Sequence, residues 1–164
     1  MVALRLIRLI ETHSGQIAGN VATNIRASRR TSNLQNVPES EMVAGMQELL
    51  QHLSEWLLTK TDTDIQNRYR EIGARRAGQG IALADSCWAV TMTKEYLWEF
   101  LQKQGFLCSA IEIYGEMELL RLLGQFFDRA LCYVVEGYKQ SRCSQPLGQT
   151  RNKNRELNLA GFVP

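Results

Sequence analysis

The chain has 164 residues, enough for one domain with a sizeable core, and 45% of them are hydrophobic while 22% are charged. A formal net charge of +2 is too small to favour nucleic acid or a membrane surface as a partner. No stretch approaches the roughly 20 apolar residues of a membrane span, and Arg5, Arg8 and Glu11 interrupt the N-terminal apolar run, unlike a secretory signal peptide.

The first predicted helix covers about residues 3–29 and places its aliphatic residues on one side. Helical periodicity dominates the whole chain, and the alternation typical of a strand is nearly absent. Ser14, Gly15 and Gly19 weaken the middle of this helix, each glycine by about 1 kcal/mol, so a kink or a junction of two helices is the alternative. Residues 31–37 predict a loop.

Pro38 predicts the start of a second helix, because proline suits a first helical position and two glutamates follow in the first turn. Apolar residues then keep helical spacing to about Leu58. After a short break, Thr61 and Asp64 have the spacing of a helix cap, which predicts the start of a third helix. Gly80 predicts its end.

A fourth helix is predicted from about Ala82 to Gly105, a glycine suited to the C-cap. Residues 106–114 are ambiguous, because IEIY resembles a short strand without any partner strand. We interpret them as a loop or as the first turn of the last helix. After about Gln140 the periodicity ends in a polar sequence marked by Gly and Pro, which predicts a flexible tail over residues 141–164.

The last predicted helix, residues 116–139, is apolar over about twice the width that one layer of core requires. Its polar side chains share one wedge, and the other positions form two neighbouring apolar stripes. Either the helix is sandwiched between two layers of its own domain, or the second stripe covers a partner chain. We treat the second stripe as a candidate homodimer interface. It consists of Leu119, Leu122, Phe126 and Tyr133.

No residue pattern predicts catalysis. The only two histidines, His13 and His52, fall on different helices and away from the apolar stripes, so we do not expect a metal or haem site. Asp62 and Asp64 resemble a carboxylate pair for Mg²⁺, but acids at a helix start are also what the helix dipole favours, and we prefer that interpretation. Serine-nucleophile and phosphate-loop motifs are absent from the sequence. We expect neither an enzyme nor a bound cofactor.

Basic residues gather at two places. Four arginines of the RYREIGARR stretch spread around the third helix, so a solvated surface with local ion pairs is favoured over a phosphate site. They are Arg68, Arg70, Arg75 and Arg76. In the tail, Arg151, Lys153 and Arg155 form a small candidate contact to nucleic acid or to an acidic protein. Without interleaved aromatic residues this signal is weak, and a nucleic-acid partner is not favoured.

The four cysteines form neither a CxxC pair nor the dense spacing of a disulfide scaffold. Three of them fall inside helical patterns, where a free thiol acts as a small apolar side chain. We therefore expect the protein in the reduced cytoplasm.

Three stretches together resemble a known family, the N-terminal domain of the RsbRD-type co-antagonists of the bacterial general-stress (sigma-B) pathway. They read LIETHSGQIAGN, RYREIGARRAGQGIALAD and QFFDRALCYVVEGYKQ, and the resemblance covers roughly residues 4–140. In the second and third stretches the matching residues are Tyr69, Gly73, Arg76, Ala77, Gly80, Ile81, Leu83, Phe127, Asp128, Ala130 and Tyr138. The chain departs from the family in the first helix. The family often has a Trp at a position where this chain has Asn20, Val21 and Ala22.

The resemblance implies an all-helical sensor or docking module. Such domains usually precede an output domain such as a STAS domain, a histidine kinase or a DNA-binding helix-turn-helix. A related group has a globin-like fold without haem and dimerises. We expect this chain to lack an output domain, so it either acts through a partner or is a fragment of a longer protein. The resemblance identifies no ligand and no catalytic residue.

We predict a single all-α domain over residues 1–140, with about five helices in a globin-like or irregular helical bundle, followed by the flexible polar tail. The predicted function is a non-enzymatic, cytoplasmic sensory or regulatory protein-interaction module of bacterial stress or two-component-type signalling, working as a homodimer with a protein partner. The alternative is a globin-like haem or small-ligand binding protein. Its pocket would be lined by Trp88, Trp98, Phe127 and Tyr138.

Overall fold

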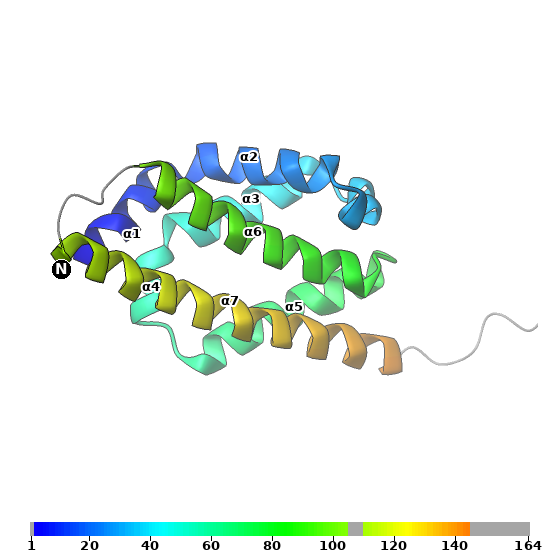
Figure 1. The fold of residues 1–164 in the computed structure, drawn as a ribbon. Coiled ribbons are helices and arrows are strands. Elements are labelled where there is room, and N and C mark those ends of the chain that lie inside the picture. Colours follow the sequence, from blue (N-terminus) through cyan, green and yellow to red (C-terminus); the bar gives the residue numbers. More distant parts are fainter. Residues whose placement is uncertain (1, 105–109, 145–164) are drawn as a thin grey trace, which may run out of the picture.

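Every element in the described part of the chain is a helix (Figure 1). The computed structural model describes residues 2–104 and 110–144. In chain order the elements are α1 (Val2–Thr12), α2 (Ser14–Ala27), the 3₁₀ helix η1 (Arg29–Asn36), α3 (Glu39–Gln51), α4 (Leu53–Leu58), α5 (Asp62–Gly78), α6 (Leu83–Lys103) and α7 (Ala110–Ser144). The all-α prediction is confirmed. These residues hold eight helical segments instead of about five, and a globin-like arrangement stays a prediction.

Two breaks account for most of the additional helices. The first predicted helix divides at His13, within the region where the sequence leaves a junction of two helices open. The second divides at His52, which the sequence does not predict. There the backbone N–H of Ser54 donates to Glu11 Oε1 of α1 at 2.8 Å. Because the first N–H groups of a helix lack partners within it, this acid stabilises a new helix start at α4.

The segment predicted as a loop, residues 31–37, lies largely in η1 instead. Thr31 has non-helical backbone angles inside this 3₁₀ helix, is fully buried, and donates its hydroxyl hydrogen to the Ile25 carbonyl oxygen. Leu34 and Val37 also lie in the core. The loop prediction is wrong because three buried side chains anchor a stretch whose composition is otherwise polar.

The predicted start and end of the third helix are confirmed. Thr61 is the N-cap of α5: its backbone N–H donates to Asp64 Oδ2 at 2.8 Å, and its hydroxyl accepts from the Asp64 backbone N–H at 3.3 Å. The hydrogen bonds from Thr61, chiefly the backbone one, lower the pKa of Asp64. Gly80 has a φ of 71°, a left-handed conformation that glycine adopts without strain. α6 ends at Lys103, and the cap predicted at Gly105 lies outside the described residues.

α7 is the longest helix and contacts α1, α4, α5 and α6. In Figure 1 it lies beside α6 at the front of the bundle, with α5 behind it and running in the same direction. Phe126 of α7 packs its ring against Trp56 of α4 and Tyr69 of α5, with centroid distances of 6.2 and 5.7 Å. Such tilted and edge-to-face pairs are favourable arrangements of buried aromatic rings.

This packing corrects the predicted dimer stripe. Leu119 is 0% exposed and Phe126 is 3% exposed, so neither side chain is available to a partner in the folded chain. Leu122 and Tyr133 are half-buried. For the first two residues, the interpretation in which α7 is sandwiched between layers of its own domain is therefore the right one, because α1, α4 and α5 supply the second layer.

The last helix also extends further than predicted. α7 continues to Ser144, so residues 141–144 are helical although the sequence predicts that the tail begins there. The remainder of the predicted tail lies outside the described residues. The same holds for the candidate basic contact formed by Arg151, Lys153 and Arg155.

Candidate functional site

Two of the three family-like stretches meet where α5 packs against α7, a contact that we call the α5–α7 junction. Gly73 of α5 faces the backbone of α7, and Gly137 of α7 faces the backbone of Arg70. A Cβ at either glycine would overlap a carbonyl oxygen of the other helix, so only glycine permits this close approach. Beyond the end of α5, Tyr138 donates its hydroxyl hydrogen to the Ile81 carbonyl oxygen at 2.7 Å. The family-like residues Gly73, Ile81 and Tyr138 therefore take part in joining α7 to α5 and to the segment that follows it.

Polar side chains extend the junction along its exposed side. Arg70 donates to Glu136 Oε2 from both Nε and Nη2, at 3.0 and 2.7 Å. Asp62, at the start of α5, accepts from the Tyr133 hydroxyl at 2.6 Å and lies 3.5 Å from Arg129 Nη1. The hydrogen bond to Asp62 raises the pKa of Tyr133. The junction thus combines a backbone approach at its centre with ion pairs and hydrogen bonds at its edge.

The residues considered as metal ligands lie apart. His13 Nδ1 is 2.9 Å from a backbone carbonyl oxygen of α1, whereas His52 is exposed and pairs with Glu55 at 3.4 Å. Asp62 faces α7, while Asp64 caps α5. Within the part of the chain that the structure describes, no group of three or more His, Cys, Asp or Glu side chains is arranged to hold a metal ion.

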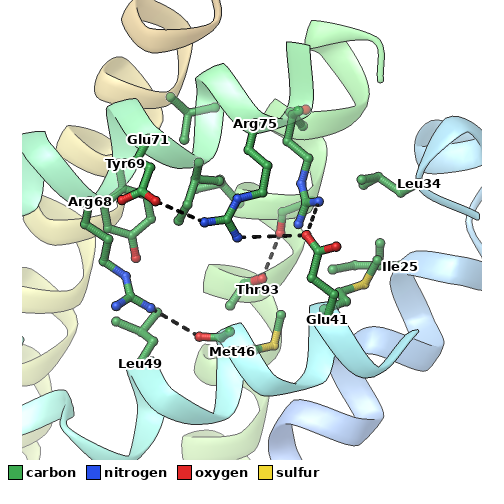
Figure 2. Close-up of a pocket in the computed structure, with 18 of the residues that line it drawn as sticks. Ile25, Leu34, Glu41, Met46, Leu49, Arg68, Tyr69, Glu71, Arg75 and Thr93 are labelled. Carbon is green, nitrogen blue, oxygen red and sulfur yellow. Dashed lines mark hydrogen bonds and ion pairs between the residues drawn. The ribbon is translucent and has the colours of Figure 1, made fainter. Parts of the chain in front are cut away.

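A pocket of about 290 Å³ lies between α3, α5 and α6 (Figure 2). Its walls are mainly aliphatic and aromatic, and they include Ile25, Leu34, Met42, Leu49, Val90 and Phe127. The hydroxyl groups of Ser86 and Thr93 in α6 also line it. Each hydroxyl donates a hydrogen bond to the backbone carbonyl oxygen four residues earlier, at 3.4 and 2.8 Å, so neither requires a partner inside the pocket.

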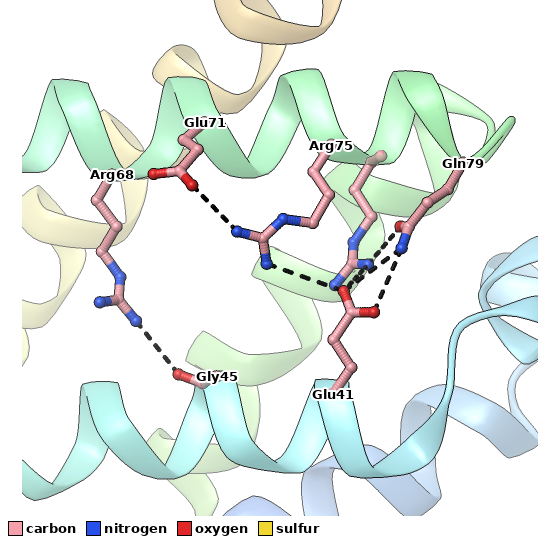
Figure 3. Close-up of polar contacts among 7 residues, drawn as sticks. Glu41, Gly45, Arg68, Glu71, Arg75 and Gln79 are labelled. Carbon is pink, nitrogen blue, oxygen red and sulfur yellow. Dashed lines mark hydrogen bonds and ion pairs between the residues drawn. The ribbon is translucent and has the colours of Figure 1, made fainter.

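Charged side chains of α3 and α5 line the rim of this pocket (Figure 3). Glu41 of α3 accepts from Arg76 Nη1 at 2.9 Å, and the same Nη1 donates to Gln79 Oε1 at 2.6 Å. Arg75 Nη2 donates to Glu71 Oε1 at 3.2 Å, while its Nη1 lies 3.9 Å from Glu41 Oε1. Glu41 therefore links α3 to two arginines of α5 across the opening.

Arg68 lies at the other end of the rim (Figure 2). It pairs with Glu48, donates to the Gly45 carbonyl oxygen at 3.2 Å, and places its guanidinium 4.9 Å from the Trp56 ring centroid. Its Nε is buried without a hydrogen-bond partner, an unfavourable state for a polar group. Beside it, burial raises the pKa of Tyr69, so this phenol stays protonated at neutral pH.

Three of the four arginines that the sequence singles out therefore gather at one pocket. The sequence predicts that these arginines lie on a solvated surface. This prediction is wrong for Arg76, whose side chain is only 14% exposed. The predicted local ion pairs do occur, as between Arg75 and Glu71. The ion pair between Arg76 and Glu41 could not be predicted from the sequence, because 35 residues separate the two.

The four side chains expected around a haem or small-ligand pocket do not come together. Of these, Phe127 alone lines the pocket between α3, α5 and α6. Trp88 lies 4.1 Å below the Arg30 guanidinium, and Trp98 is 40% exposed. Tyr138 belongs to the α5–α7 junction.

The first turns of α7 expose large apolar side chains that sequence reasoning missed. Ile111 is 73% exposed, Tyr114 75% and Met117 63%. Because the sequence leaves residues 106–114 ambiguous between a strand, a loop and a helix, no face could be assigned to them. The sequence does contain a signal for these exposed residues, because apolar residues continue at helical spacing before residue 116, where the helix was predicted to start.

Comparison with known proteins gives one match. The family described as the RsbT co-antagonist protein rsbRD N-terminal domain matches residues 15–151. No curated protein and no solved structure matches the chain. Among the described residues, no helix has both the length and the apolar character needed to cross a membrane.

Proposed function

This chain belongs to the family of RsbT co-antagonist protein rsbRD N-terminal domains, and we propose that it is a cytoplasmic, non-enzymatic regulatory module of partner-switching stress signalling. The family match carries this proposal. It is supported by the roles of the family-like residues Gly73, Tyr138 and Ile81, which join α7 to α5 and to the segment that follows α5.

The proposed mechanism is a change in how α7 packs. The α5–α7 junction fixes one half of α7 through Gly73, Gly137 and the Arg70–Glu136 pair. A partner or ligand that shifts α5 would move α7 with it, because the backbones touch directly and leave no side chains to absorb the motion. The surface that α7 presents at its other end would change accordingly.

That other end is the proposed homodimer surface. Ile111, Leu122 and Tyr133 fall on one line of α7, because eleven residues make about three helical turns. Tyr133 is occupied by its bond to α5, so we assign the surface to the exposed first turns, with Leu122 at its margin. The proposed occupant is a second copy of the chain in two-fold pairing. Glu118 and Arg121 lie on the same face and would offer opposite charges to an antiparallel copy.

Binding to RsbT, the protein that the family description names, tests the proposed function. We expect the purified chain to bind RsbT reversibly in surface plasmon resonance or biolayer interferometry. We also expect Arg70→Ala to weaken binding, because it loosens the α5–α7 junction. An Arg8→Ala variant, changed at an exposed position of α1, serves as the control. Absence of binding at tens of micromolar would contradict the proposal.

A further inference from the structure

We propose that the pocket between α3, α5 and α6 binds a small amphipathic molecule that has an apolar body and one carboxylate. The proposal does not depend on the regulatory role, because it concerns binding to the chain by itself. It rests on the size and walls of the pocket, on the arginines at its rim, and on an arginine whose donors are largely unused.

The size and the walls define the body of the ligand. A volume of about 290 Å³ lies at the lower end of the range for small-molecule sites, which is roughly 300–1,000 Å³. Met42 and Met46 contribute flexible thioether side chains to the wall, and such side chains adapt to irregular apolar shapes. Because Ser86 and Thr93 already bond their own helix, the interior favours a body without polar groups.

The rim defines the head group. Three arginines lie at the rim, and three glutamates pair with them: Glu41 and Glu71, which also line the pocket, and Glu48, which pairs with Arg68. Because these charges balance, the preference for an anionic head depends on which arginine has N–H donors left to offer. Arg76 is held by Glu41 and Gln79, and Arg68 by Glu48 and the Gly45 carbonyl oxygen.

Arg75 is the rim arginine that is free to bind a head group. A guanidinium has five N–H donors, and Arg75 makes one hydrogen bond, to Glu71 at 3.2 Å. Its other acidic neighbour, Glu41, lies 3.9 Å away, beyond hydrogen-bond distance. The side chain is 49% exposed, so these contacts are weak and can be exchanged. The planar fork of an arginine matches the two oxygens of a carboxylate, which is why we assign that group.

Three probes of equal chain length test the head group: decanoate, decan-1-ol and decylamine, each titrated into the full chain by isothermal titration calorimetry. We expect decanoate to bind at least about tenfold more tightly than the alcohol, since a hydrogen bond to a charged group contributes that much. Decylamine should bind most weakly. Equal affinities for the acid and the alcohol, or no binding of decanoate, would overturn the proposal.

Two variants locate the binding. Arg75→Gln should remove the preference for the acid and leave the affinity for the alcohol nearly unchanged. Gly45→Leu should abolish binding of both, because Gly45 lines the pocket in α3 and a Cβ there meets no atom within 4 Å. Leucine is also the better helix former, so this variant is expected to fold.

Gly19→Leu is the matched control, since Gly19 lies in α2, has equally open surroundings and does not line the pocket. It should bind decanoate as the wild type does. If Gly45→Leu binds decanoate unchanged, or if Gly19→Leu loses binding to the same extent, the ligand binds elsewhere and the proposal is wrong. Binding to RsbT, measured separately, decides the regulatory role independently of this result.

Discussion

The two ends of α7 carry similar apolar residues and yet differ in what covers them. Toward its C-terminal end, Phe126 and Val134 are buried, while Ile111 and Tyr114 near the N-terminus are more than 70% exposed. α5 accounts for part of this difference in burial. Its first residue, Asp62, lies opposite the C-terminal half of α7, so α5 covers that half and not the first turns. The position of neighbouring helices, and not apolar content, decides which stretch of a helix is core and which is left for binding.

The largest expected effect comes from comparing one aromatic residue at each end of α7. Phe126→Ala should lower the free energy of unfolding by about 3–5 kcal/mol, because it leaves a cavity between α4, α5 and α7. Tyr114→Ala should change it by no more than about 0.5 kcal/mol, as expected for an exposed position. Urea unfolding followed by circular dichroism measures both. Similar losses for the two variants would show that the first turns of α7 are also core.

An intermediate effect is expected from a single added methyl group. Gly137→Ala places a Cβ against the Arg70 carbonyl oxygen and should destabilise the fold by about 1–3 kcal/mol, since the helices must move apart. Gly124→Ala is the matched control in the same helix, where a Cβ meets no atom within 4 Å. It should stabilise the protein by up to about 1 kcal/mol. Thermal melting of both variants checks this, and a Gly137→Ala variant as stable as the wild type would contradict the close approach.

The smallest effect concerns pH. The hydrogen bond to Asp62 raises the pKa of Tyr133 in the folded chain above its ordinary value of about 10. A raised pKa means that the contribution to stability is present below about pH 10 and is lost as the pH rises through the folded pKa. Asp62→Asn should lower the pKa of Tyr133, which NMR or tyrosinate absorbance can follow. An unchanged pKa in that variant would show that the bond does not form in solution.

Local signals in the sequence predicted local features of the structure. Thr61 and Asp64 predicted the N-terminal cap of α5, and Gly80 predicted its end. Pro38 predicted the start of α3. Each of these residues acts on backbone groups only a few residues away. The family-like residues also marked the α5–α7 junction, although only the structure shows that they meet.

Features that depend on distant residues could not be predicted. At the break near His52, the Ser54 backbone N–H donates to Glu11, which lies 43 residues earlier in the sequence. Which stripe of α7 is covered depends on where α1, α4 and α5 lie, so Leu119 was assigned to the wrong surface. The pocket brings together residues from six helical segments, α2, η1, α3, α5, α6 and α7, and no spacing within one helix indicates it.

Sedimentation velocity of the wild type, of Ile111→Lys and of Gln140→Lys tests the account most directly, because it asks whether the exposed end of α7 binds a second copy. Gln140 is an exposed residue near the other end of the same helix and provides the control. We predict a dimer for the wild type and for Gln140→Lys at tens of micromolar, and a monomer for Ile111→Lys with unchanged helix content. A wild type that stays monomeric, or an Ile111→Lys variant that still dimerises, would contradict the account.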